Sequence, residues 1–185
     1  MKIVRQAPRT LVAALTLSAS VFAGIVAHEG FTDKAIIPVP GDVPTIGIGA
    51  TVYEDGTKVK MTDTITVAKA VRLSVSHIAK DEVVLRECFG DAKLYQHEWD
   101  AYVDLAYNIG PGAVCRSSIV AKVKAEQYEA ACNTIGEFVC GPATEATRAK
   151  PGEKCYSTKK PMRVIRGLEN RRREAVSLCL GKAAG

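Results

Sequence analysis

The sequence lacks the residue groupings of a metal or nucleotide site. Its three histidines stand far apart, at positions 28, 77 and 97, and its six cysteines include no C-x-x-C pair. Structural zinc sites usually draw their ligands from such short spacings. A glycine-rich phosphate loop, a Ser-His-Asp order and an internal repeat are also missing. We therefore expect no metal and no cofactor, and no nucleotide or serine-hydrolase chemistry.

The six cysteines are an even number, which indicates disulfides if the chain is exported. Six cysteines allow about 15 complete pairings, and spacing alone does not choose among them. A bond between Cys140 and Cys155 is the favoured single pair, because it would close the glycine- and proline-containing loop between them.

The chain is long enough for one sizeable domain, or for one domain split into two lobes. Its net charge of +5 is unevenly spread, with +3 on residues 1–27, −5 on 28–115 and +7 on 116–185. The basic last third fits an anionic polymer. No nucleic-acid-binding motif accompanies it, so we expect no nucleic-acid partner. Much of the basic charge lies on a predicted amphipathic helix and is expected to be a solvated face, and the anionic cell envelope explains the same bias.

The N-terminus has the form of an export segment. Lys2, Arg5 and Arg9 precede residues 10–27, which carry no charge. The run is barely long enough to span a bilayer, and its many small residues make it a weak anchor. One interpretation is a tether that later leaves the membrane intact. Another is a signal peptide cleaved after Ala23, and a third is a buried helix of a cytosolic protein.

Cleavage after Ala23 would leave Glu29 only a few residues from a new N-terminus, without support for the loop that follows. We therefore favour intact release. The predicted organisation is a signal-arrest-release or signal segment over residues 1–27 and a catalytic domain over residues 28–185.

A small β-hairpin is expected early in that domain. The prolines between residues 38 and 44 predict a loop. Thr45 to Val52 alternates and is rich in β-branched residues, and Asp55-Gly56 is a tight-turn signal before residues 58–60. Gly47 and Gly49 in the strand indicate close backbone approach, to a sugar ring or to a neighbouring helix.

The remainder predicts helices. A linking helix begins near Thr62, capped by Asp63 or Thr64, with an apolar stripe of Val67, Val71, Val75 and Ile78. Further helices are expected over residues 97–109, 126–138 and 165–178, with a long loop over 141–161 and Trp99 in the core. The fold class is α+β, mostly helical, with a hairpin lobe against a helical lobe and a cleft between them.

Several motifs resemble those of the phage T4-type lysozymes of glycoside hydrolase family 24. His28-Glu29-Gly30 followed by Thr45-Ile46-Gly47-Ile48-Gly49 is similar to the family's catalytic signature. Residues 99–110 resemble its central helix and the turn that ends it, and residues 167–179 its closing helix. The resemblance covers roughly residues 28 to 181 and implies a lysozyme-like fold.

Cleavage of a glycosidic bond needs a proton donor and, on the opposite face of the sugar, a carboxylate. The resemblance implies Glu29 as the acid, and Thr45 as the residue that places the attacking water. Asp42 is the candidate second carboxylate, although the family acid usually stands six residues before the threonine, where this chain has Val39. Asp33 is a weaker substitute.

The implied function is an endolysin N-acetylmuramidase that cleaves the β-1,4 bond between N-acetylmuramic acid and N-acetylglucosamine in peptidoglycan, with inversion. A lytic transglycosylase and a non-catalytic peptidoglycan-binding protein are the alternatives. We expect a monomer exported to the host periplasm, first tethered to the inner membrane through residues 10–27, with a functional link to a holin or pinholin.

Overall fold

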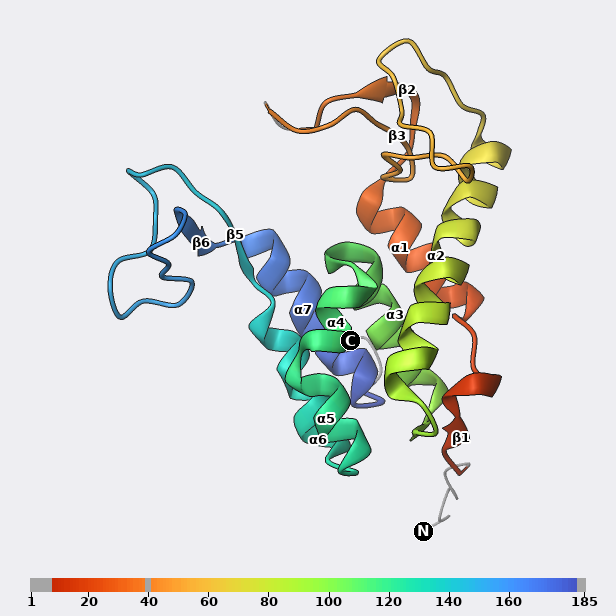
Figure 1. Cartoon of the computed structure of the whole chain (residues 1–185), viewed down its shortest axis with the longest axis vertical. Coiled ribbons are helices and arrows are strands. Elements are labelled where there is room, and N and C mark those ends of the chain that lie inside the picture. The colour runs from red at the N-terminus through yellow and green to blue at the C-terminus, as the bar shows by residue number, and fades with distance from the viewer. Residues whose placement is uncertain (1–7, 39–40, 183–185) are drawn as a thin grey trace.

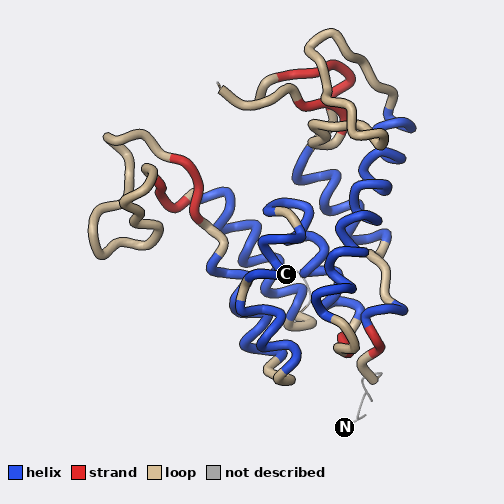
Figure 2. Tube along the Cα trace, in the orientation of Figure 1, coloured by secondary structure: helices blue, strands red, loops and turns tan. Residues whose placement is uncertain are grey.

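The computed structural model describes residues 8–38 and 41–182 (Figure 1). Lys2, Arg5 and Val39, which figure in the predictions above, lie outside these residues. The helices are α1 (Ala19–Glu29), α2 (Val67–Phe89), α3 (Gln96–Ile109), α4 (Pro111–Arg116), α5 (Ser118–Lys124), α6 (Tyr128–Thr134) and α7 (Arg166–Cys179), with 3-10 turns η1 (Val12–Ala14) and η2 (Ile135–Glu137). The strands form three antiparallel pairs (Figure 2): β1 (Thr10–Leu11) with β4 (Lys93–Leu94), β2 (Thr32–Ile36) with β3 (Thr45–Gly47), and β5 (Cys140–Pro142) with β6 (Met162–Val164). The α+β class, mostly helical, is confirmed.

The long helix α2 links two hydrophobic cores. Its N-terminal part contributes Ala70 and Leu73 to a small core beneath β2 and β3. Its C-terminal part contributes Leu85 and Phe89 to the large core of the helical lobe, around Trp99. The predicted linking helix and the core position of Trp99 are therefore confirmed, and the chain has two lobes, the upper one in Figure 1 being the hairpin lobe.

Two details of the linking helix were predicted wrongly. Its cap is Thr66, whose side chain accepts a hydrogen bond from the Lys69 N–H, rather than Asp63 or Thr64. Within the predicted apolar stripe, Val67 and Val75 are exposed. The spacing of apolar residues gives the helical period, but it does not say how much of the stripe a neighbouring element covers.

The strand pairing of the hairpin lobe also differs from the prediction. Strand β3 pairs with β2, in a segment not predicted as a strand. At the predicted hairpin around Asp55-Gly56, the structure has only an isolated antiparallel β-bridge between Val52 and Lys58. Pairing partners are set by contacts between distant segments, so a strong local turn does not guarantee a regular hairpin.

The helical predictions for the C-terminal half are confirmed. Helix α3 ends where Gly110, with φ of 85°, precedes Pro111, and α7 covers most of residues 165–178. The predicted loop over 141–161 is the tip of a projection that we name the arm, residues 140–164, with β5 and β6 at its base (Figure 1).

Three disulfides join all six cysteines: Cys88–Cys115, Cys132–Cys179 and Cys140–Cys155. The predicted disulfide chemistry and the favoured Cys140–Cys155 pair are thus confirmed. The first two bonds tie α2 to α4 and α6 to α7, and the third closes the arm.

The N-terminal segment is part of this fold. Val12, Leu15 and Ile25 are buried in the large core, and strand β1 pairs with β4. The predicted domain boundary after residue 27 falls inside α1. Among the helices of the described residues, none combines the length and apolar character needed to cross a membrane.

Candidate active site

Glu29 is the last residue of α1 and lies where the two lobes meet. Its Oε1 accepts a hydrogen bond of 2.6 Å from Arg171 Nη1, and Arg171 Nη2 donates one of 3.1 Å to Asp104 Oδ1. The side chains of Glu29 and Arg171 are 24% and 10% exposed. An arginine held between two carboxylates is fixed in direction, so Arg171 orients the carboxyl group of Glu29.

Electrostatics keep Arg171 charged at this place. Burial would lower the pKa of the guanidinium, but Asp104 and Glu29 together outweigh burial and raise it. Arg171 therefore stays positively charged between the two acids.

Gly49 lies against Glu29 from the hairpin lobe. Its φ is +73°, and a Cβ built on it would stand 3.2 Å from Glu29 Oε2. Gly47, with φ of +66°, would place a Cβ 2.9 Å from the Cβ of Ala70 in α2. The alternating glycines thus serve two close approaches, Gly47 to a helix and Gly49 to the acid itself.

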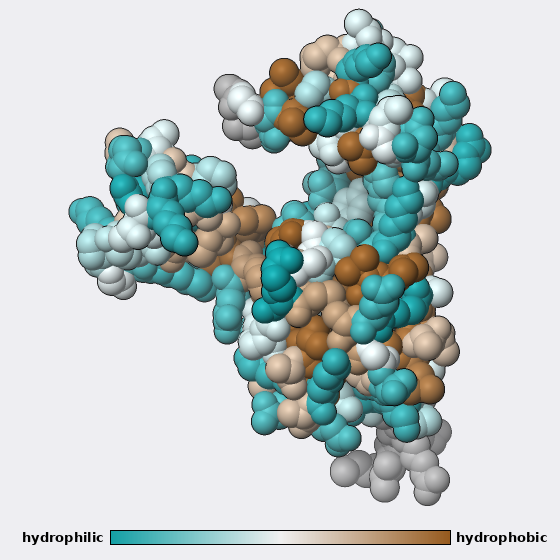
Figure 3. Space-filling view, in the orientation of Figure 1, coloured by the Kyte–Doolittle hydropathy of each residue, from teal (hydrophilic) through white to brown (hydrophobic). Residues whose placement is uncertain are grey.

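A cavity of about 420 Å³ opens beside Glu29 between the lobes. Its walls come from the end of α1, the turn after β3, the middle of α2 and the end of α3, with the residues Glu29, Gly49, Ala50, Thr51, Val52, His77, Lys80, Asp81, Tyr107 and Asn108. The predicted inter-lobe cleft is therefore present. Figure 3 shows the face between the hairpin lobe and the arm as hollowed. A cavity of about 620 Å³ lies on the hairpin lobe, but its lining does not include Glu29.

The end of α3 braces the cavity. The Tyr107 hydroxyl donates a hydrogen bond of 2.6 Å to the carbonyl of Ile48 and so ties the helix to the strand that carries the glycines. Asn108 accepts a short hydrogen bond from Arg172, a residue only 1% exposed. This contact holds Asn108 in the wall of the cavity.

Asp42 and Thr45, the other two predicted catalytic residues, do not line this cavity. Asp42 is exposed and accepts a hydrogen bond of 2.8 Å from the Val43 N–H. The Thr45 hydroxyl donates to the Val43 carbonyl at 3.2 Å. Asp42 and Thr45 thus meet at Val43, but neither joins Glu29, and the exposed Asp33 lies on β2.

Asp81, which the sequence did not single out, shares the cavity with Glu29. Burial raises the pKa of this carboxyl group to about 6. Burial also lowers the pKa of His77, one helical turn earlier on α2. The cavity wall formed by α2 therefore disfavours charge, as expected for a site that is partly shielded from water.

Sequence reasoning also missed Arg171 and Asp104. The basic residues near the end of the chain were predicted as a solvated face, and this is wrong for Arg171, which points into the protein. Arg172 was predicted on the apolar-leaning stripe of the final helix, and its burial confirms this. A usable signal was present, because the three consecutive arginines 171–173 span too wide an angle of a helix for all to face solvent.

No group of three histidine, cysteine, aspartate or glutamate side chains gathers as a metal site in residues 8–38 and 41–182. The chemistry available is that of a carboxyl group oriented by an arginine, in a cavity with a second carboxyl group of raised pKa.

Comparison with known proteins agrees with this geometry. The family model described as phage lysozyme matches residues 26–175. The SAR-endolysin of Haemophilus phage HP1 (strain HP1c1) is 30% identical over 154 residues, which is 77% of this chain and 70% of that protein. The endolysin of Salmonella phage P22 is 31% identical over 108 residues, 58% of this chain and 73% of that protein.

A solved structure gives the same fold. The endolysin from Escherichia coli O157:H7 phage FAHEc1 superimposes with a TM-score of 0.75 at 23% identity, over 93% of this chain and 98% of that one. Together, the family model, the related endolysins and the cavity beside Glu29 show that the chain belongs to the phage lysozyme family and is a lysozyme-type glycoside hydrolase that acts on peptidoglycan.

Proposed function

We propose that this enzyme is an endolysin that cleaves the β-1,4 bond between N-acetylmuramic acid and N-acetylglucosamine and thereby lyses the host cell. The observation that carries the proposal is the position of Glu29. Its carboxyl group lies at the inter-lobe cavity, is oriented by Arg171 and lies close against Gly49, where a Cβ would stand 3.2 Å from Oε2.

In the proposed reaction, Glu29 gives its proton to the glycosidic oxygen, and the bond from that oxygen to the anomeric carbon of the muramic acid breaks. A water molecule adds to this carbon from the opposite face, which inverts its configuration. Asp42 takes the proton of that water, and the hydroxyl of Thr45 positions it. The exposure of Asp42 leaves its carboxylate accessible to water and to a bound sugar.

A lytic transglycosylase is the second candidate, and one observation favours it. Asp42 and Thr45 do not line the cavity that holds Glu29. In a transglycosylase, the 6-hydroxyl of the muramic acid takes the place of water and forms an anhydro ring, so a single acidic residue can suffice.

Digestion of purified peptidoglycan tests these proposals, with the wild type, Glu29→Gln and Asp42→Asn compared and the released sugars identified by mass. Reducing muramic ends that depend on both residues would support the hydrolase. Anhydro ends would establish the transglycosylase instead. If folded wild-type protein released no sugar, only a peptidoglycan-binding role would remain.

We further propose that the chain reaches the host periplasm tethered to the inner membrane through residues 10–27 and is later released intact. The related HP1 protein is named a SAR-endolysin, which supports this order of events. The fold adds a physical argument. Cleavage after Ala23 would cut through α1 and remove Val12 and Leu15 from the core.

Each such side chain contributes about 1.5–3 kcal/mol when fully buried, against a total stability of about 5–15 kcal/mol for a typical protein. A cleaved enzyme would therefore lose a large part of its stability. The mass of the soluble periplasmic form decides this point, because the released form keeps residues 1–23 and a processed form lacks them.

The exposed surface of the arm is basic and suits an anionic substrate. The arm carries the exposed basic residues Lys150, Lys154, Lys159, Lys160 and Arg163, and it borders the hollowed face in Figure 3. Peptidoglycan bears the carboxylates of its peptide branches, which such residues can attract. We propose a monomer without a nucleic-acid partner, whose release is linked to a holin or pinholin that depolarises the membrane.

A further inference from the structure

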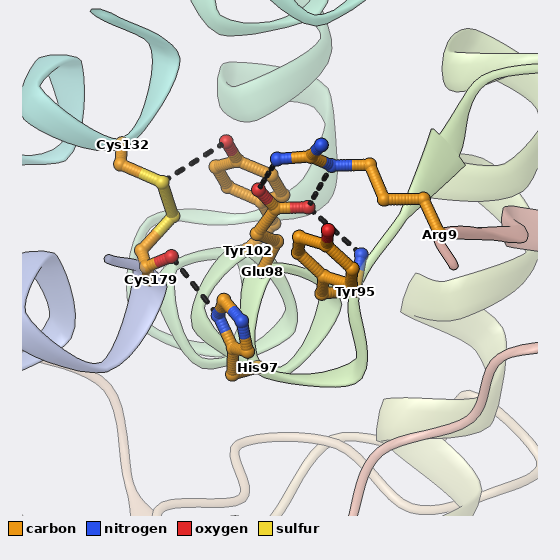
Figure 4. A network of polar contacts seen from close by, with 7 residues as sticks. All are labelled: Arg9, Tyr95, His97, Glu98, Tyr102, Cys132 and Cys179. Carbon is orange, nitrogen blue, oxygen red and sulfur yellow. Dashed lines mark hydrogen bonds and ion pairs between the residues drawn. A yellow bond between two sulfur atoms is a disulfide. The ribbon is translucent and has the colours of Figure 1, made fainter. Parts of the chain in front are cut away.

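Arg9, from the basic flank of the N-terminal segment, is docked in the helical lobe (Figure 4). Its Nε and Nη2 donate to the two carboxylate oxygens of Glu98, at 3.0 and 2.8 Å. The guanidinium carbon also lies 4.1 Å from the ring centre of Tyr95 and 3.5 Å from that of Tyr128. A carboxylate fork and two aromatic faces form the arrangement that selects arginine over lysine.

The pocket is built without help from Arg9. Glu98 lies in the first turn of α3, Tyr95 caps that helix, and Tyr128 begins α6. The Cys132–Cys179 disulfide fixes α6 against α7 and lines the cavity of about 340 Å³ beside the pocket. All of these walls come from segments other than the N-terminal one.

Glu98 depends on Arg9 for charge compensation. Its side chain is only 4% exposed, and Oε2 also accepts a hydrogen bond of 2.8 Å from the Tyr95 N–H. A buried carboxylate that loses its cationic partner is strongly destabilising. The helical lobe thus contains a buried carboxylate, Glu98, whose arginine partner lies 89 residues earlier, near the N-terminus.

Two other buried acids accept backbone hydrogen bonds from the same segment. Glu82 Oε1 accepts a hydrogen bond of 2.7 Å from the Leu17 N–H, and Asp100 Oδ1 accepts one of 2.8 Å from the Ser18 N–H. Both acids are buried, at 6% and 4% exposure. Three buried carboxylates of α2 and α3 therefore accept hydrogen bonds from the segment that precedes α1.

We propose that Tyr95, Glu98 and Tyr128 form an intramolecular binding site for the guanidinium of Arg9, which captures the N-terminal segment as it leaves the membrane. This inference rests on the proposed membrane tether. While residues 10–27 span the bilayer, Arg9 lies on the cytoplasmic side, and Glu98 lies in the periplasm. The pair forms only after the segment has crossed to the periplasm, and it then holds the segment in the folded enzyme.

The first experiment measures the pair in the purified full-length chain. Arg9→Ala lowers the thermal midpoint by about 4–10 °C, because it leaves Glu98 buried without its partner. In the double variant Arg9→Ala, Glu98→Gln this loss is partly recovered, since the uncompensated charge is gone. Arg173→Ala, which removes an exposed arginine of α7, serves as the control and changes the midpoint little.

Additive effects of Arg9→Ala and Glu98→Gln would overturn the binding site. If Arg9→Ala does not fold, Arg9→Lys replaces it in the same cycle. Lysine keeps the charge but lacks the fork, so we expect an intermediate midpoint.

The second experiment measures release in cells after the membrane potential is collapsed, as the fraction of intact chain found in the soluble periplasm. Glu98→Gln lies outside the membrane segment, yet we expect it to lower this fraction at least threefold, as Arg9→Ala does. Arg173→Ala releases as the wild type does. The mass of the soluble form is determined in every case.

The outcomes separate the two proposals. Soluble wild-type protein that keeps residues 1–23 but is released equally well with Glu98→Gln would overturn the capture site and leave the tether standing. Soluble protein that begins after Ala23 would overturn both, because Arg9 would then be absent from the enzyme.

Discussion

Gly49→Ala tests whether the hairpin lobe leaves just enough room for Glu29, the proposed catalytic acid. Residue 49 has φ of +73°, and the new Cβ would stand 3.2 Å from Glu29 Oε2. An L-residue in this conformation costs about 1–2 kcal/mol, which corresponds to about 2–8 °C in the thermal midpoint of a protein of this size. The carboxyl group must in addition shift by a few tenths of an ångström.

A displacement of about 1 Å in an active site can cost about a hundredfold in rate. We therefore expect Gly49→Ala to lower kcat on soluble peptidoglycan fragments by roughly threefold to tenfold. Gly56→Ala is the matched control. Its φ is +84°, so the backbone strain is similar, but nothing lies within 4 Å of its Cβ position.

The control should lose thermal stability and keep its turnover. The reasoning fails if Gly49→Ala retains the wild-type kcat while its midpoint falls as much as that of Gly56→Ala. Such a result would mean that the glycine serves only the turn of the backbone and not the placement of Glu29.

Three further perturbations follow from the structure. Arg171→Lys keeps the charge, but a lysine cannot hold both Glu29 and Asp104 as the arginine fork does. We expect kcat to fall roughly tenfold while circular dichroism shows an unchanged fold. An unchanged kcat would refute the orienting role of Arg171. Asp81 has a pKa raised by burial to about 6 against about 3.9 when unfolded, so its ionisation removes stability as the pH rises from about 4 to 6. Allowing for its partial exposure, Asp81→Asn should raise the unfolding free energy by about 1–2 kcal/mol at pH 8 and by almost nothing below pH 4; denaturant titrations at both pH values measure this, and an equal effect at both would contradict it. The Cys140–Cys155 bond closes a loop with a sequence separation of 15, so replacing both cysteines by serine should cost up to about 3 kcal/mol; a denaturation midpoint equal to that of the wild type would show that the arm unfolds independently of the body.

Local patterns predicted much of the helical lobe. Helix α3 was predicted to within one residue, because its apolar period and the Gly110-Pro111 stop both act within a few residues of the chain. The hairpin lobe was predicted less well, because β3 chose β2 as its partner over the nearer segment after Asp55-Gly56. The choice of strand partner depends on how both strands bury side chains against α2, which no local window contains.

The active site was likewise predicted only in part from local sequence. The motif resemblance led to Glu29 and the glycines, and the structure places Glu29 at the cavity with Gly49 beside it. The partners Arg171 and Asp104 come from helices 142 and 75 residues away along the chain, and a charged residue on a helix gives no local sign of whether it faces water or another charge. The roles of Asp42 and Thr45 stay predictions.

The sequence by itself determined the class of fold, the disulfide chemistry and the residue proposed as the catalytic acid, because period, composition and motif are properties of short stretches. Only the tertiary structure decided how the other four cysteines pair, that Arg171 points inward and what Arg9 contacts. The physical reason is that the favourable placement of a charge depends on the whole environment that surrounds it. Arg9 beside Glu98 and Arg171 beside Glu29 each gain their counterion from a segment that folding alone brings near.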